Sequence, residues 1–290
     1  MRSAPVTLEE LVAPLSEEDF LSLLRLRELT LLRSTNPNRH KALLNWDMLI
    51  GMIDRGEHPK SLVEFRLARE SVMVPPDQWL VRVGNANKVD PGKIKTFLDD
   101  GFSLIITPID GHVPALAALR DNIRARVSEQ IKVGVIVTAG KGGAFKLHYD
   151  PEDLIILQVE GSKRWRIYGP PVANPVVGMT SPEPPPETSP IFDEVLEPGD
   201  ILFVPGGNWH HCENGPRRSL HLGIFFTPPT AWHAVRKLTS QLIAEENFVK
   251  PITRLADAGE RAALEADVKK RAIELISHFE FKDFLADWAK

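Results

Sequence analysis

Two short motifs, far apart in the chain, constrain its fold more than any other feature. The first is H-Y-D, which places His148 and Asp150 two residues apart. The second is P-G-G-N-W-H-H, which places His210 after a glycine-rich turn. Two histidines and one carboxylate are the ligand set that binds non-haem Fe(II) and leaves other coordination positions open. The three residues therefore predict a metal site, provided that the fold brings them together.

The spacing of these residues favours a particular architecture. Side chains two residues apart on a β-strand point to the same face, so a strand would direct His148 and Asp150 at one ion. His210 must then arrive from another strand, which favours a small barrel whose inner wall carries all three. An isolated H-x-D is common by chance, and a lone histidine is more often a surface or core residue. The sequence around these motifs must therefore distinguish a metal site from unrelated surface or core residues.

The bulk composition sets wide limits. The chain has 290 residues, of which 43% are hydrophobic and 26% charged, as in an ordinary globular protein. A net charge of -4 gives no overall basic field, so we do not expect a nucleic-acid partner. The single cysteine, Cys212, excludes an internal disulfide framework. We find no signal peptide and no spanning apolar run, and we expect a soluble cytoplasmic protein without a membrane partner.

The first part of the chain alternates between helical and strand patterns. Thr7 and Ser16 are typical helix caps, and Thr7 with Glu10 fits a capping box. The predicted helices cover residues 7–33, 43–53, 91–100 and 113–128. The predicted strands cover residues 30–33, 61–74, 79–83 and 101–107.

From residue 132 the pattern becomes β-rich. The predicted strands cover residues 132–138, the H-x-D segment, 154–159, 164–168, 195–205 and 218–227, with a turn at Gly161. Prolines crowd residues 170–190, which predicts an extended surface loop. Residues 231–288 carry two amphipathic helical stripes and are predicted to form an appended helical unit.

Taken together, three segments resemble the JmjC branch of the cupin superfamily, and most closely the bacterial cupin-4 proteins, which include the ribosomal oxygenases. They are H-Y-D, L-Q-V-E-G-S-K-R-W-R-I-Y-G-P-P and L-E-P-G-D-I-L-F-V-P-x-G-x-W-H-H. The asparaginyl hydroxylase that acts on hypoxia-inducible factor is similar more distantly. The resemblance implies a mostly β fold with helices, a double-stranded β-helix of the cupin/JmjC jelly-roll type. We expect an N-terminal α/β elaboration (1–103), the JmjC core (104–229) and a C-terminal helical dimerisation unit (230–290).

The resemblance also implies roles for individual residues. His148, Asp150 and His210 would bind Fe(II), and Lys163, fifteen residues after the first histidine, would bind the distal carboxylate of 2-oxoglutarate, with O2 as the other co-substrate. The charge of Lys163 suits this role, because a dicarboxylate needs a cation at its far end and a buried lysine is costly without a partner.

The sequence departs from the family pattern in three places. Many ribosomal oxygenases have a co-substrate-binding asparagine fourteen residues before the first metal histidine, and here Gly134 stands there. Thr138, on the same face of that strand, is the candidate replacement. Several relatives use a serine or threonine on the penultimate strand, which falls at or near His221. The ribosomal oxygenases also end in a winged-helix domain, which we do not expect before Lys290.

The remaining histidines, cysteine and tryptophans are assigned structural roles. His211 should lie on the face opposite His210, and Cys212 should be a small buried hydrophobe. His40, His112 and His233 have no partner in the sequence and are interpreted as surface or capping residues. Trp165 and Trp209 are interpreted as wall and core residues.

The sequence favours a dioxygenase that hydroxylates a C–H bond of an amino-acid side chain in a protein or peptide. Two other enzymatic functions stay open, hydroxylation of an amino-acid-derived small molecule or natural product and N-methyl demethylation. A cupin ligand-binding sensor is the non-enzymatic alternative, and an interaction protein acting through its C-terminal helices is another. Because about 60 helical residues bury too little surface alone, we predict a homodimer with Leu275, Phe279 and Phe284 in or beside the interface.

Overall fold

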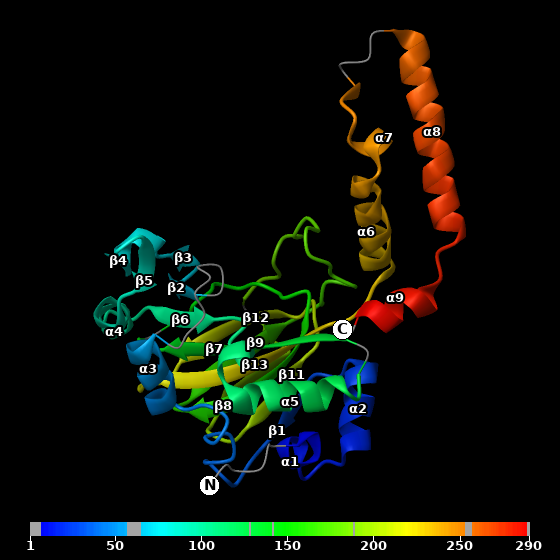
Figure 1. Ribbon diagram of the computed structural model, residues 1–290. Coiled ribbons are helices and arrows are strands. Elements are labelled where there is room, and N and C mark those ends of the chain that lie inside the picture. The colour runs from blue at the N-terminus through cyan, green and yellow to red at the C-terminus, as the bar shows by residue number, and fades with distance from the viewer. Residues whose placement is uncertain are drawn as a thin grey trace. The chain divides into compact units, whose positions relative to one another are not determined.

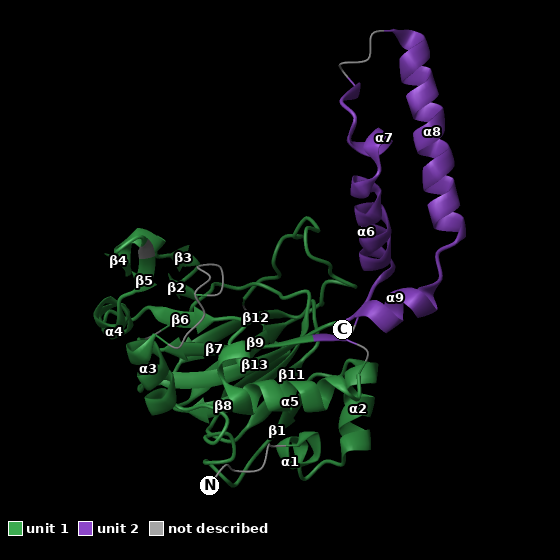
Figure 2. Ribbon diagram, in the orientation of Figure 1, with its two compact units in different colours: residues 1–127, 131–227 green, residues 128–130, 228–290 purple. Residues whose placement is uncertain are grey.

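Strand β8 (Asp153–Glu160) is buried at every position from Asp153 to Val159, which requires other structure on both faces of its sheet. The computed structural model shows what supplies this cover (Figure 1). It describes residues 7–56, 65–127, 129–140, 142–187, 189–252 and 257–288. Residues 1–127 with 131–227 form one compact unit, and residues 128–130 with 228–290 form a second (Figure 2). The three-part division expected from the sequence stays a prediction.

The first unit is built on two sheets. The larger has the strand order β1 (Thr30–Leu32), β11 (Ile201–Val204), β8, β13 (Ser219–Thr227), β7 (Gln130–Thr138), β6 (Ser103–Ile106), β2 (Phe65–Arg69) and β3 (Val72–Met73). The smaller has the order β10 (Phe192–Leu196), β9 (Lys163–Tyr168) and β12 (Trp209–Asn214). A separate antiparallel hairpin joins β4 (Leu80–Val83) to β5 (Ala86–Val89), and β5 was not predicted.

The inner face of β8 packs against the smaller sheet. Leu154 and Ile156 form an apolar cluster with Trp165 and Ile167 from β9. The neighbouring strands pair antiparallel, with β11 on one side of β8 and β13 on the other. Two facing antiparallel sheets with this order make a double-stranded β-helix, so the predicted fold class is confirmed.

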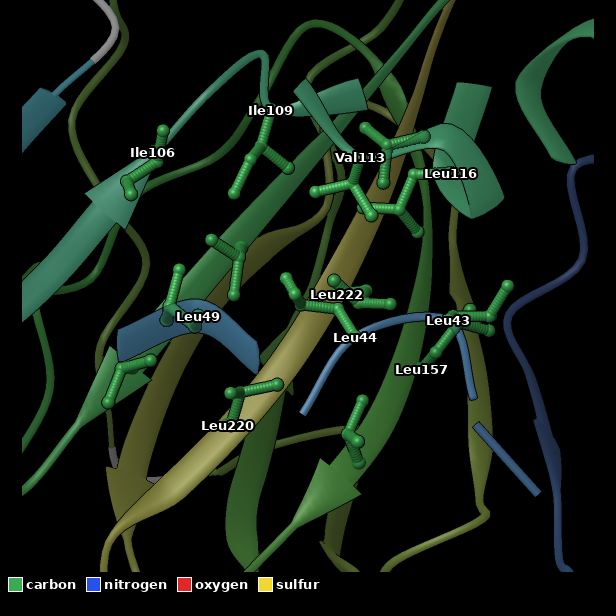
Figure 3. Packing of buried hydrophobic residues seen from close by; sticks show 14 of the residues in the cluster. Leu43, Leu44, Leu49, Ile106, Ile109, Val113, Leu116, Leu157, Leu220 and Leu222 are labelled. Carbon is green, nitrogen blue, oxygen red and sulfur yellow. The ribbon is translucent and has the colours of Figure 1, made fainter. Parts of the chain in front are cut away.

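Helices cover the outer face of the larger sheet. They are α1 (Leu8–Val12), α2 (Glu17–Leu26), α3 (Trp46–Arg55), α4 (Pro91–Asp99) and α5 (Pro114–Arg124), with two short 3-10 turns, η1 (Pro76–Gln78) and η2 (Asp110–His112). Figure 3 shows Leu157 and Leu222, from β8 and β13, among leucines of these helices such as Leu49 and Leu116. This outer core leaves the inner face of the sheet free to line a site.

Local capping explains where these helices begin. The Thr7 side chain accepts a hydrogen bond from the Glu10 backbone N–H, and the Glu10 carboxylate accepts one from the Thr7 N–H, which confirms the predicted capping box. Ser16 caps α2, so residues 7–33 form two helices. The helix predicted from residue 43 begins later, because the Asn45 side chain caps it at the Met48 N–H.

Two other predictions were wrong. The strand predicted over residues 61–74 is a hairpin of β2 and β3, because Glu70 and Ser71 both take positive φ angles and reverse the chain; residues 61–64 lie outside the described part. His40 is buried, with its Nε2 3.0 Å from the Gly199 carbonyl oxygen. Burial lowers the pKa of His40 to about 4, so the ring is neutral and donates this hydrogen bond.

The second unit is helical, as predicted. Its elements are α6 (Ala231–Gln241), η3 (Leu242–Ala244), α7 (Glu246–Val249), α8 (Ala258–Ser277) and α9 (Phe281–Trp288). A capping box between Thr230 and His233 begins α6, so His233 is a capping residue as predicted. None of the residues of α8 is buried. Among the described residues, no helix is both long enough and apolar enough to cross a bilayer.

Candidate metal centre

The H-x-D segment is held by its backbone and not by a full strand, so that part of the prediction was wrong. His148 makes a single antiparallel bridge to His210, with backbone N···O distances of 3.1 and 2.7 Å. The next pair would be Asp150 with Asn208, but the Asn208 N–H donates instead to the Pro205 carbonyl at 3.3 Å, so the ladder ends. The Asp150 carbonyl accepts a hydrogen bond from the Gly207 N–H at 2.8 Å. The segment is therefore fixed at both residues whose side chains matter.

The three predicted ligands come together. One donor atom from each of His148, Asp150 and His210 lies within 4.8 Å of the others. The Nδ1 of His148 is 2.8 Å from the Lys146 carbonyl oxygen, and that of His210 is 3.0 Å from the Asn208 carbonyl oxygen. Each Nδ1–H donates to a carbonyl, which leaves the Nε2 lone pair free for a metal.

The electrostatics of His210 also suit metal binding. Its side chain is 4% exposed, and burial, followed by the charge of His148, lowers its pKa to about 3. The ring is therefore neutral at physiological pH, as a metal ligand must be. Asp150 supplies the anionic donor, with Oδ2 3.6 Å from the His210 Nε2. Two imidazoles and one carboxylate fit a divalent transition metal such as Fe(II).

The triad opens into a cavity of about 400 Å³ between the two sheets. Its wall includes Lys163, Trp165 and Cys212 from the smaller sheet, with His221 and Phe225 from the larger. Trp165 stacks on the His210 ring, with centroids 5.5 Å apart and an interplanar angle of 29°. The ligand set thus lies at the wall of a partly open cavity whose lining is mostly apolar, and we call this cavity the chamber.

Lys163 lies inside this chamber, as expected. It is 2% exposed, and its Nζ donates a hydrogen bond to the Thr138 Oγ1 at 3.0 Å, which links the two sheets. It has no carboxylate partner among the described residues, and burial lowers its pKa to about 8. The neighbouring Arg164 points outward and pairs with Asp193 at 2.6 Å, so it is not part of the chamber.

His221 also lies at the chamber wall. It sits opposite Gln158 of β8, and its ring centroid is 5.8 Å from that of Trp165. Burial, followed by the charge of Lys163, lowers the pKa of His221 well below its usual value. Its Nδ1 has no hydrogen-bond partner. A neutral ring with an unused nitrogen can serve an incoming ligand, and its predicted role there stays a prediction.

The position of Gly134 is filled by neighbouring side chains. A Cβ at residue 134 would collide with the Thr107 Oγ1 and lie 3.2 Å from the Phe225 ring. An asparagine cannot fit there without moving both. Sequence reasoning missed Thr107 and Phe225, together with Arg66 and Phe145, which also line the chamber. No motif marks these residues: strand pairing turns Arg66 on β2 and Phe225 on β13 inward, and Thr107 and Phe145 lie outside the strands.

The assigned structural residues fall mostly as expected. Trp209 is buried against Tyr149, with ring centroids 4.9 Å apart, and His211 lies on the opposite side of β12 from His210. Cys212 is partly buried at the chamber wall, and burial raises the pKa of its thiol to about 12. The thiol is therefore protonated at physiological pH and acts as a small apolar group.

The chain is similar to several known proteins. Residues 114–234 match the JmjC domain family. The chain is 29% identical over 219 residues to the bifunctional lysine-specific demethylase and histidyl-hydroxylase NO66 of Drosophila mojavensis, which covers 74% of the chain and 24% of that protein. It is 27% identical over 263 residues to human ribosomal oxygenase 1, and the match covers 85% of this chain and 39% of that protein. The chain thus spans well under half the length of these relatives.

A solved structure extends the similarity to the fold. The ribosomal oxygenase YcfD of Escherichia coli, in complex with cobalt and 2-oxoglutarate, superposes with a TM-score of 0.57. Its sequence identity is 20%, over 95% of this chain and 71% of that one.

A double-stranded β-helix whose inner wall gathers two histidines and a carboxylate defines the class, a cupin-fold protein with a facial metal-binding triad. Within that class, residues 114–234 match the JmjC domain.

We predict that Lys163 makes the stability of the metal-free protein depend on pH. The folded pKa, about 8, lies below the 10.5 of an exposed lysine, so below pH 8 the fold carries the full cost of a buried charge. Between pH 8 and 10.5 the unfolded chain holds the proton and the folded chain does not, so this group makes stability rise with pH. The gain approaches about 3 kcal/mol.

Urea unfolding of the wild type and of Lys163→Met at pH 7.5 and pH 10 measures this effect. The free energy of unfolding of the wild type should increase relative to that of the variant at the higher pH. An unchanged difference between the two proteins would show that the lysine is not buried as described.

Proposed function

We propose that this chain is an Fe(II)- and 2-oxoglutarate-dependent oxygenase that hydroxylates a C–H bond of an amino-acid side chain in a protein or peptide, with O2 as the other co-substrate. One observation carries the proposal. The triad shares the chamber with Lys163, a buried cation without an anionic partner among the described residues. The similar proteins support it, since NO66 is named a histidyl-hydroxylase and YcfD was solved with cobalt and 2-oxoglutarate.

Each residue around the chamber has its own role in the proposed reaction. His148, Asp150 and His210 would hold the metal, which when bound supplies oxygen activation coupled to the oxidation of 2-oxoglutarate to succinate and carbon dioxide. The Lys163 ammonium would bind the distal carboxylate by a charge-assisted hydrogen bond. Thr138 holds that ammonium in place with its Oγ1, and His221 lies near enough to the chamber to contribute a neutral donor. The apolar wall around Trp165 and Phe225 excludes water from the reacting groups.

Demethylation is the second candidate, because the same relative is also a lysine-specific demethylase by name. Hydroxylation of an N-methyl carbon releases formaldehyde, so the two outcomes need the same site and differ in the substrate. An amino-acid-derived small molecule as substrate, a ligand-binding role without turnover and a cytoplasmic location stay predictions.

We predict that the Fe(II)-loaded protein converts 2-oxoglutarate to succinate in air, and that Asp150→Ala abolishes this turnover. Lys163→Ala should raise the 2-oxoglutarate concentration needed for half-maximal turnover by about 10- to 100-fold, since a hydrogen bond to a charged group contributes about 1.5–3 kcal/mol. Arg164→Ala is the matched control, because that side chain lies on the other face of β9 and pairs with Asp193. Turnover in Asp150→Ala at the wild-type rate would contradict the proposal, as would equal effects of the two cation-removing variants.

We also propose that the second unit forms a homodimer. Exposed apolar side chains on α8 and α9 include Ile273 at 64%, Ile276 at 63% and Phe281 at 59%. Phe284 is buried, and Leu275 and Phe279 line a small pocket with Leu238 of the same unit. Exposed apolar residues at this density favour a self-complementary contact with a second copy.

Light scattering should give a particle of about twice the 32.4 kDa chain mass at micromolar concentration. Ile273→Asp combined with Ile276→Asp should give the single-chain mass, because two charges cannot be buried in an apolar interface without partners. A wild-type mass equal to one chain at all concentrations would contradict the dimer.

A further inference from the structure

Arg66 places a second cation in the chamber that holds the triad. On β2 it is paired with Ile105 of β6, which is in turn paired with Ile136 of β7. Directly paired residues share a face of the sheet, and all three line the chamber. The pairing therefore turns the guanidinium of Arg66 toward the inside of the double-stranded β-helix.

The Arg66 side chain is half-buried and makes no hydrogen bond or ion pair with any described residue. Its Nε is shut off from solvent without a partner. Of the lysines at the chamber wall, Lys132 pairs with Glu152 at 2.9 Å, and Lys163 donates a hydrogen bond to the neutral Thr138 hydroxyl at 3.0 Å. A guanidinium that is partly withdrawn from water and has no counter-ion indicates a site for an anion.

This anion site differs from the one at Lys163. Thr138, which holds Lys163, is paired across the sheet with Ser103 and then Ala68, and Arg66 is two residues further along β2. Two strand spacings of about 4.8 Å and two residues of about 3.4 Å separate the backbones of Arg66 and Thr138 by roughly 12 Å.

Packed side chains also connect the surroundings of Arg66 to the first metal histidine. Ile105 and Ile136, its neighbours across the sheet, pack in one cluster with Phe145, and the Phe145 ring is 5.3 Å from that of His148. Thr107, two residues after Ile105, adds a second polar group without a partner.

We propose that Arg66 binds a carboxylate of the substrate, so that the residue or molecule to be hydroxylated carries, or lies next to, an acidic group. This inference rests on the proposed function, because it takes Lys163 as the anchor of 2-oxoglutarate and leaves Arg66 for the substrate. A carboxylate suits the planar guanidinium, which can donate two parallel hydrogen bonds to it. The acid can be a side-chain carboxylate of a peptide or the free α-carboxylate of an amino acid or chain end.

Paramagnetic broadening of probe signals tests this proposal without knowledge of the true substrate. The full chain is loaded with Co(II) and 2-oxoglutarate, and the NMR lines of small probes are recorded, because broadening by the ion falls steeply with distance and reports weak binding near it. N-acetylglutamate α-amide carries a side-chain carboxylate, and N-acetylglutamine carries an α-carboxylate. N-acetylglutamine α-amide is the neutral match.

At least one of the acidic probes should be broadened about tenfold more than the neutral probe, and which one it is identifies the source of the carboxylate. Arg66→Gln should remove the difference, and Arg66→Lys should keep part of it. Equal broadening of all three probes in the wild type would overturn the proposal, as would an acidic preference that persists in Arg66→Gln. Displacement of the acidic probe by excess 2-oxoglutarate would also overturn it, because the two anions would then share one site.

The same spectra test the proposed function independently, through the binding of 2-oxoglutarate near the metal. The methylene signals of 2-oxoglutarate should be broadened by Co(II) in the wild type and in Arg66→Gln, but not in Asp150→Ala. If 2-oxoglutarate is unaffected in the wild type, the proposed function fails, while the comparison of acidic and neutral probes still decides the role of Arg66.

Discussion

The backbone bridge between His148 and His210 is the contact on which the site depends. Its two hydrogen bonds attach the H-x-D segment, which is not itself a regular strand, to strand β12. They place the two histidine side chains beside each other, with ring centroids 4.3 Å apart. The Gly207 N–H then fixes the carbonyl of Asp150. These main-chain contacts orient the donors before any ion binds, so the ligand geometry is largely independent of the loops around it.

The second constraint is electrostatic. Lys163 lies between the two sheets with a neutral hydroxyl as its hydrogen-bond partner, and burial lowers its pKa. A carboxylate bound beside the ammonium would offset this cost. Arg66 repeats the arrangement in the next part of the same chamber. The inner wall therefore has two cations without an anionic partner among the described residues, in addition to the metal ligands, and this pattern favours anionic ligands.

Much of this arrangement could be predicted from the sequence, because motifs and local rules determine it. The triad, Lys163 and the capping residues Thr7 and Ser16 follow from spacing, from the family resemblance and from side-chain chemistry close in the chain. The remainder depends on contacts between distant segments. The partner of His40 is Gly199, 159 residues away, so no local pattern reveals that the ring is buried.

The chamber wall escaped prediction for the same reason. Arg66 faces inward because of its register with Ile105, and the space at Gly134 is filled by Thr107, which is far from it in sequence. The H-x-D strand was wrong because the glycine-rich turn before His210 directs the Asn208 N–H to the Pro205 carbonyl, so no pair with Asp150 forms.

The central claim is that one ligand joins the triad to Lys163. A crystal structure of the protein with Mn(II) and 2-oxoglutarate, grown without oxygen, tests it most directly. The account predicts anomalous density for the metal within bonding distance of the Nε2 atoms of His148 and His210 and a carboxylate oxygen of Asp150, with the distal carboxylate hydrogen-bonded to the Lys163 Nζ. Metal at any other set of residues, or a 2-oxoglutarate held by Arg66 with Lys163 left without an anionic partner, would contradict it.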